Sequence, residues 1–150
     1  MKTKVSIIIP IFNEDKYIAK LVKKIQKIKL KKFALEIICV NDGSTDYTLL
    51  ELKKLNNIKI INQKNYGKGR AVQAGIKKAN GKLCLIQDAD LEYDPKDYKK
   101  LLSPFLTKRK IAVYGSRFIN KKKIFGLNLT NENKQSLSSY LFNFILSFFF

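Results

Sequence analysis

Apolar and polar positions alternate in blocks along most of the chain, and the blocks follow one repeated order. Five short runs are mainly apolar and rich in β-branched residues, at 5–9, 35–40, 58–61, 82–87 and 111–114. Such runs are typical of strands buried on both faces of a parallel sheet. Between them, apolar residues recur every three or four positions, which is the spacing of an amphipathic helix. The pattern therefore predicts an α/β fold with a mostly parallel, Rossmann-like sheet flanked by helices.

Single residues set the expected limits of several elements. Pro10 is expected to end the first strand, because proline cannot donate a hydrogen bond to a strand ladder. Asn13 fits the N-cap of the first helix, and the dipeptide Asp94-Pro95 fits the first turn of a later one. The polar segments that follow the strands are then loops.

Three of these loops carry the candidate chemistry. They span 10–14, 42–46 and 88–92, and Arg117 follows the fifth predicted strand. Right-handed crossovers bring the carboxyl ends of parallel strands to one edge of the sheet, where α/β folds bind their ligands. We therefore expect the four polar elements to converge on one site.

The third loop begins directly after an apolar run and is strongly acidic. On an extended backbone Asp88, Asp90 and Glu92 would face the same way, with no basic residue between Ile86 and Tyr93 to relieve their repulsion. A divalent cation would relieve it, and carboxylate oxygens suit Mg²⁺ or Mn²⁺. Taken alone, an Asp-x-Asp segment is more often an acidic turn that caps the next helix. Convergence with the other loops favours a metal and diphosphate anchor.

Basic residues near the same edge fit a phosphate ligand. Lys68 and Arg70 lie in a glycine-broken loop, and together with Arg117 they could clamp a diphosphate. Asp42 could accept hydrogen bonds from a base or a ribose. Each has a plainer interpretation, because the two loop cations fit surface charges and Asp42 fits a residue that only shapes its turn. The loop lacks the third glycine of a dinucleotide fingerprint, and the chain has no Walker A pattern, which argues against a dehydrogenase or a P-loop ATPase.

Composition narrows the choice of function. Thirty Lys and Arg against twelve Asp and Glu give a net charge of +18, which favours polyanionic partners, although lysines scattered over helix faces fit a solvated surface equally well. No aromatic platform or recognition motif for nucleic acid accompanies the charge, so no nucleic-acid partner is expected. The absence of His excludes His-dependent hydrolysis within this chain. Cys39 and Cys84 lie in apolar runs and are expected to be buried thiols in a reducing compartment.

The character of the chain changes after residue 120. We predict one domain over 1–120, and a basic and polar linker over 121–150 that ends in an apolar helix. That apolar stretch, 140–150, is shorter than the roughly 20 residues that span a bilayer. It fits either a membrane-interfacial helix or one packed on the domain's own core. Because the stretch is cut off on three Phe, we expect the chain to be a piece of a longer protein.

Five motifs in order carry a family resemblance. They occupy 8–14, 40–46, 65–71 with Gly75, 88–92 and 115–118. The set resembles the inverting family 2 glycosyltransferases with the GT-A nucleotide-diphospho-sugar transferase fold. Within that family it is most similar to the dolichyl-phosphate mannosyl- or glucosyltransferases and their bacterial polyprenyl-phosphate relatives.

The resemblance implies a binding role for several residues. Those that would hold the nucleotide sugar are Pro10, Phe12, Glu14 and Asp42, together with Lys68 and Asp88 at its phosphates. Phe12 stands where the family often has Tyr. Asp88, Asp90 and the position of Glu92 would bind Mg²⁺ or Mn²⁺, although Glu92 departs from the Gln common there.

The resemblance also implies an activity. Asp90 and Arg117 would act in catalysis, the arginine on the donor diphosphate or the acceptor phosphate. A hexose would pass from a GDP- or UDP-sugar to a polyprenyl (dolichyl or undecaprenyl) phosphate. The enzyme would be cytoplasmic, peripheral or anchored at the membrane face, and would serve the cell envelope.

The general base leaves two alternatives open. Many members use an acidic residue from a later motif as the base, and we find no counterpart of that motif after residue 118. An anionic phosphate acceptor needs little base assistance, whereas a sugar hydroxyl does. Transfer to a saccharide acceptor in cell-surface polysaccharide synthesis is one alternative, and an inactive nucleotide-binding fragment is the other.

Overall fold

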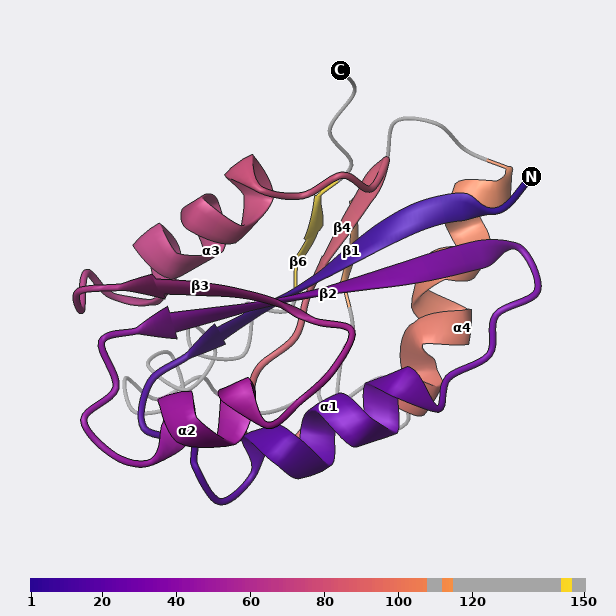
Figure 1. Ribbon diagram of the computed structural model, residues 1–150. Coiled ribbons are helices and arrows are strands. Elements are labelled where there is room, and N and C mark those ends of the chain that lie inside the picture. The colour runs from indigo at the N-terminus through magenta and orange to yellow at the C-terminus, as the bar shows by residue number, and fades with distance from the viewer. Residues whose placement is uncertain (108–111, 115–143, 147–150) are drawn as a thin grey trace, which may run out of the picture.

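The centre of the molecule is one sheet with helices on both faces (Figure 1). The computed structural model describes residues 1–107, 112–114 and 144–146. Within these residues the strand order is β3-β2-β1-β4-β6-β5. Four strands are parallel: β1 (Thr3–Ile11), β2 (Phe33–Asp42), β3 (Lys59–Gln63) and β4 (Leu83–Ile86). β6 (Phe144–Leu146) lies antiparallel between β4 and β5 (Val113–Tyr114). The predicted α/β fold with a mostly parallel sheet is confirmed.

The helices divide between the two faces of the sheet. α1 (Ile18–Gln26), α2 (Thr48–Lys53) and α4 (Tyr98–Leu102) cover one face, and α3 (Lys68–Lys77) covers the other (Figure 1). Two short 3₁₀ turns, η1 (Pro95–Asp97) and η2 (Ser103–Leu106), flank α4. As predicted, Asp94 opens this region, because its side chain accepts a hydrogen bond from the Lys96 N–H at 3.0 Å.

β1 is the central strand, and it is buried on both faces. Ile7 and Ile9 point into the core beneath α1 and α4, whereas Ile8 points into a smaller cluster beneath α3. Each of these side chains is 0 % exposed, and full burial of one Ile contributes about 1.5–3 kcal/mol. Gly75 lets α3 lie directly against the strand, since a Cβ built there would collide with the Ile8 side chain. This packing explains the nearly continuous apolar run.

Two predicted limits at the end of β1 are wrong. Pro10 does not end the strand but pairs in register with Val40 of β2. The Ile8 carbonyl accepts from the Gln87 N–H on the β4 side, and alternation turns the Pro10 nitrogen to that side as well, beyond the end of β4. The missing N–H therefore costs no ladder bond. Asn13 is not the N-cap of α1, which begins only at Ile18; it adopts a left-handed backbone with φ 56°.

The predicted C-terminal helix is wrong for the residues that can be seen there. Phe144–Leu146 form β6, which pairs with Cys84 and Leu85 of β4. A short apolar run fits a strand or a helix equally well from periodicity alone, and here it covers an edge of β4 that would otherwise be open. The rest of 121–150 and the predicted domain boundary lie outside the described residues. Among the described residues no helix has the length and apolar character needed to cross a bilayer.

Candidate functional site

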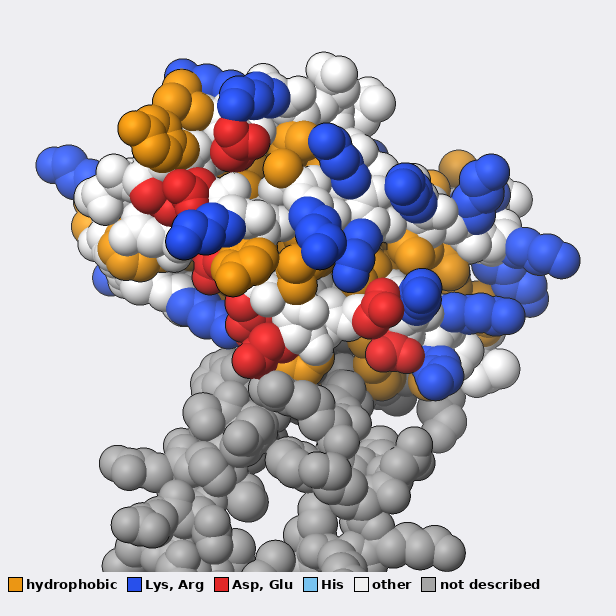
Figure 2. Space-filling view, turned by 90° about the horizontal axis from the view of Figure 1, so that it is seen from below, with side chains coloured by type: hydrophobic (Ala, Val, Ile, Leu, Met, Phe, Trp, Pro, Cys, Tyr) orange, Lys and Arg blue, Asp and Glu red, His pale blue; other side chains and the backbone are white. Residues whose placement is uncertain are grey.

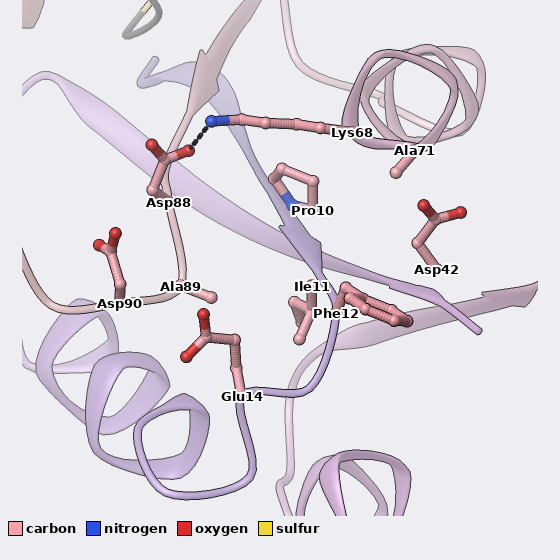
Figure 3. A pocket seen from close by; sticks show the side chains of 10 residues that line it. All are labelled: Pro10, Ile11, Phe12, Glu14, Asp42, Lys68, Ala71, Asp88, Ala89 and Asp90. Carbon is pink, nitrogen blue, oxygen red and sulfur yellow. Dashed lines mark ion pairs between the residues drawn. The ribbon is translucent and has the colours of Figure 1, made fainter. Parts of the chain in front are cut away.

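A pocket of about 220 Å³ lies at the carboxyl edge of the parallel strands. Its lining residues come from β1, β2, α3 and the loops after β1 and β4: Pro10, Ile11, Phe12, Glu14, Asp42, Lys68, Ala71, Asp88, Ala89 and Asp90. Figure 3 shows Glu14, Asp88 and Asp90 on one side, Asp42 on the other, and the β1 end between them. The predicted convergence of the first three polar loops is confirmed. Arg117 lies outside the described residues.

Hydrogen bonds join the loop after β1 to the loop after β2. The Asn13 N–H donates to Ser44 Oγ at 3.0 Å, and Asn13 Oδ1 accepts from the Thr45 N–H at 2.8 Å. The Glu14 N–H donates to Thr48 Oγ1 at 2.8 Å. Asn tolerates the left-handed backbone that this geometry needs better than most residues. These hydrogen bonds hold the segment that carries Phe12 and Glu14. Sequence patterns did not predict them.

Phe12 contributes an exposed apolar face to the pocket. Its side chain is 47 % exposed, although it follows directly on a buried strand. Aromatic rings left open beside a pocket are suited to stacking against a planar ligand. The predicted nucleotide contact of Phe12 stays a prediction.

Asp42 organises the loop that begins α3. Its carboxylate is buried and accepts from the Gln63 side-chain amide at 2.7 Å and from the N–H groups of Tyr66 and Gly67 at 3.0 and 2.8 Å. Gly67 has φ 87°, a backbone that favours glycine. Asp42 thus shapes the loop before α3 rather than its own turn, and it sets the start of the helix from which Lys68 extends.

Lys68 and Asp88 form an ion pair across the pocket. Lys68 Nζ lies 2.7 Å from Asp88 Oδ1, and Figure 3 shows the lysine reaching from α3 to the acidic loop. Asp88 Oδ1 is buried, and in the described part of the chain it has no aligned hydrogen-bond partner. A buried carboxylate oxygen needs a cationic neighbour, and in the described part of the chain the Lys68 ammonium group supplies it. Arg70, by contrast, is exposed and does not line the pocket.

The expected alignment of the carboxylates is wrong for Glu92, whereas Asp88 and Asp90 both line the pocket. β4 ends at Ile86, before the acidic segment, and the chain turns at Leu91, where φ is 64°. Asp90 Oδ1 accepts from the Glu92 N–H at 3.1 Å, and Glu92 is absent from the pocket lining. Within the described residues no three acidic, Cys or His side chains are arranged to hold a metal ion. The metal-binding roles of Asp88, Asp90 and Glu92 stay predictions.

Glu14 is the third carboxylate that the fold brings to Asp88 and Asp90. Burial raises its pKa, and the negative charges of Asp90, Asp46 and Asp88 raise it further. A cation or a hydrogen-bond donor bound between these groups would relieve the repulsion. The sequence placed Glu14 near the acidic loop through the order of the strands, and the family resemblance gave it a role in binding the nucleotide. The structure confirms that it lies near this loop, and the binding role stays a prediction.

Three curated proteins similar to this chain are named for sugar transfer or synthesis with a polyprenyl phosphate. The chain is 34% identical over 127 residues to a dodecaprenyl-phosphate galacturonate synthase of Rhizobium johnstonii, covering 80% of this chain and 38% of the relative. It is 37% identical over 132 residues to a dolichyl-phosphate beta-glucosyltransferase of Trichomonas vaginalis (78% and 41%). It is 34% identical over 125 residues to the dolichol-phosphate mannosyltransferase of Pyrococcus furiosus (81% and 35%). The chain thus spans only about two fifths or less of the length of these relatives.

Solved structures share the fold. S. aureus TarS residues 1–349 match with a TM-score of 0.57 and 30% identity, over 69% of this chain and 33% of that chain. Glucosyl-3-phosphoglycerate synthase of Mycobacterium tuberculosis, in complex with Mn²⁺, UDP-glucose and phosphoglyceric acid, matches with a TM-score of 0.62 and 20% identity, over 73% and 42%. The predicted GT-A fold is confirmed. The family model described as "Glycosyl transferase family 2" matches residues 6–149, and the chain belongs to that family.

Proposed function

We propose that this chain carries the donor-binding part of an inverting glycosyltransferase that moves a hexose from a nucleotide sugar to a polyprenyl phosphate. The observation that carries the proposal is the pocket itself. It joins an exposed aromatic ring and a buried carboxylate at one side to a lysine and three acidic side chains at the other. A nucleotide sugar has the same two parts, a planar base with a ribose and an anionic diphosphate. The relatives named for polyprenyl-phosphate transfer support the choice of acceptor.

The donor's nucleoside would lie against Phe12 and Asp42. The open face of Phe12 offers stacking, and Asp42 retains lone pairs beyond the three bonds that it accepts. The diphosphate would then lie toward Lys68, which can leave its ion pair with Asp88 for a phosphate oxygen. UDP and GDP are both compatible with this arrangement.

A divalent cation fits the acidic side of the pocket. The carboxylates of Asp88, whose Oδ1 lies beside Lys68 Nζ, and of Asp90 offer hard oxygen ligands, which suit Mg²⁺ or Mn²⁺. When bound, such an ion supplies neutralisation of the charge that develops on the departing diphosphate. Asp88 and Asp90 would hold it, and Glu14 would add negative potential nearby. Arg117 would contact the donor or acceptor phosphate.

The acceptor would approach from a membrane surface. A polyprenyl phosphate is already anionic at its attacking oxygen, so little base assistance is needed. The net charge of +18 favours contact with an anionic cytoplasmic leaflet. Figure 2 shows lysines spread over the face that carries α1 and α2, where Lys20, Lys23 and Lys24 are exposed. A peripheral place at the cytoplasmic face is therefore part of the proposal.

Transfer of labelled hexose tests the proposal. The chain is incubated with UDP-glucose or GDP-mannose, Mg²⁺ or Mn²⁺, and undecaprenyl or dolichyl phosphate, and the lipid product is measured. Product formation should collapse on chelation and in Asp90→Asn, but not in Asp97→Asn, which changes an exposed carboxylate on η1. Turnover that survives both chelation and Asp90→Asn would contradict the proposal.

A second candidate is nucleotide binding without turnover. The observation that favours it is the length of the chain, which spans 35% to 41% of the relatives compared. Calorimetry that finds metal-dependent UDP or GDP binding, with no transfer from any donor, would support it. Transfer to a saccharide in place of the lipid phosphate would instead support the polysaccharide alternative.

A further inference from the structure

We propose that Gln87 and Tyr98 are positioning residues that hold the acidic loop, residues 88–93, in the shape that binds the donor's diphosphate and its cation. The inference rests on the function proposed above and adds to it. Neither side chain lines the pocket. Gln87 directly follows β4, Tyr98 begins α4, and both side chains are buried.

Gln87 ties the two ends of the acidic loop together. Its side-chain Nε2 donates to the Asp88 carbonyl at 3.0 Å and to the Tyr93 carbonyl at 3.4 Å. Its own backbone N–H donates to the Ile8 carbonyl at 2.9 Å, which fixes it to β1. The side-chain amide of Gln87 therefore joins the first and last residues of the loop, and its backbone N–H joins them to the central strand.

Tyr98 fixes the orientation of that amide. Its hydroxyl donates to Gln87 Oε1 at 2.9 Å, so the Nε2 end must face the loop carbonyls. Gln87 is 2% exposed and Tyr98 is 1% exposed. A buried polar pair in an apolar surrounding is tolerated because all of its bonds are made, and removal of one partner leaves the other unsatisfied.

The acidic loop needs the hydrogen bonds of Gln87 and Tyr98, which we call the brace, because the loop is not part of the sheet. β4 ends at Ile86, and the loop contains Leu91 in the left-handed region, which an apolar side chain seldom adopts. The loop also carries Asp88 and Asp90, which both line the pocket. A change in the Asp88 carbonyl position would move both carboxylates relative to Lys68. The brace thus acts through Asp88 and Asp90, and it touches no ligand itself.

The test separates positioning from general stability. The variant Tyr98→Phe keeps the ring and removes the hydroxyl, and Tyr17→Phe is the matched control because Tyr17 is 45% exposed and lies off the pocket. UDP and GDP affinity is measured by calorimetry, once with Mn²⁺ and once with a chelator. Loss of groups that orient metal ligands lowers metal affinity by about 10- to 100-fold. We expect Tyr98→Phe to weaken Mn²⁺-dependent binding about tenfold, and to change metal-free binding less than twofold.

A second variant checks that the two residues act as one unit. Gln87→Met retains the volume but removes both loop bonds, and Tyr98→Phe added to it should weaken Mn²⁺-dependent binding no further. Equal loss with and without Mn²⁺, or no loss in either variant, would overturn the inference. Titration with Mn²⁺ alone, followed by electron paramagnetic resonance, separates the two proposals. Wild-type chain that binds Mn²⁺ but no nucleotide contradicts the proposed function only, whereas a chain that binds neither contradicts both.

Discussion

Two carboxylates at opposite ends of the sheet differ in how completely the fold satisfies them. Glu36, on β2 near the amino end of the strands, accepts from Ser6 Oγ at 2.6 Å and from the Asn80 N–H at 3.0 Å, and Lys59 Nζ lies 2.7 Å from it. Asp88, at the carboxyl end, pairs its buried Oδ1 with Lys68 Nζ at 2.7 Å, and among the described residues this oxygen accepts no aligned hydrogen bond. Their side chains are 9% and 20% exposed. Both carboxylates are therefore largely buried, but in the described part of the chain Glu36 accepts several hydrogen bonds and Asp88 does not.

This difference in hydrogen bonding indicates that Glu36 stabilises the fold, whereas Asp88 is open to a ligand. Burial alone would raise the pKa of Glu36, but hydrogen bonds from Lys59, Ser6 and Asn80 and the charge of Lys4 lower it to about 2. These partners belong to β1, β3 and the turn after α3, so one side chain joins several elements. Among the residues that the structure describes, no comparable set surrounds Asp88. Removal of Glu36 should therefore act on stability, and removal of Asp88 on ligand binding and turnover.

The largest effect is expected for Asp88→Asn. It should lower hexose transfer at least 100-fold, about 2.7 kcal/mol in the activation barrier, because a neutral amide binds the cation and diphosphate poorly. Stability should change by less than about 1 kcal/mol, since the lost ion pair is partly exposed. Transfer assays and urea unfolding on the same preparation give both numbers. If Asp88→Asn lowered the unfolding free energy as strongly as it lowers transfer, Asp88 would be a stabilising residue like Glu36.

Glu36→Gln should show the reverse. A neutral amide accepts fewer bonds and cannot pair with Lys59, so unfolding free energy should fall by about 2 kcal/mol. Nucleoside diphosphate affinity per folded molecule should stay within about twofold, because Glu36 lies away from the pocket lining. The matched control is Glu51→Gln, which removes a surface pair with Lys54 and should cost less than about 0.5 kcal/mol. A stable Glu36→Gln chain that no longer binds nucleotide would refute the assignment.

Acid should weaken the fold through Glu36. Its pKa is lowered in the folded chain from 4.5 to about 2, so the unfolded chain binds the proton more readily. The stability it contributes is present above about pH 5 and is lost as pH falls toward 2, with about 2 kcal/mol lost between pH 6 and pH 3. Urea unfolding at both pH values measures the loss. The difference between wild type and Glu36→Gln should shrink at pH 3; a constant difference would mean that charge is not the cause.

Strands and helices whose apolar residues are regularly spaced could be predicted from the sequence, and so could the sheet topology that follows from their order. β1, β2 and β4 came from their apolar runs, and the rule for strand ends placed Glu14, Asp42 and Asp88 at one edge. That rule uses only the chain order of strands and helices. It needs no knowledge of individual contacts.

What escaped prediction depends on contacts between distant residues or on single backbone angles. The turn at Leu91 takes Glu92 out of line, and no periodicity records a φ of 64°. The insertion of β6 beside β4 joins segments far apart in the chain. The bond between Gln87 and Tyr98 likewise needs the fold before it can be seen. Local patterns carry too little information for such pairings.

The smallest expected effects lie within α3, which begins at the pocket and ends against the core. A Cβ on Gly75 would collide with Ile8 and lie 3.3 Å from Val40 Cγ2, whereas one on Gly69 meets nothing within 4 Å. Overpacking costs about 1–3 kcal/mol, and Ala gains up to about 1 kcal/mol over Gly in a helix. Gly75→Ala should therefore destabilise by about 1 kcal/mol, and Gly69→Ala should stabilise by about 0.5 kcal/mol. Urea unfolding decides the signs, and equal signs would show that the two ends of α3 are packed alike.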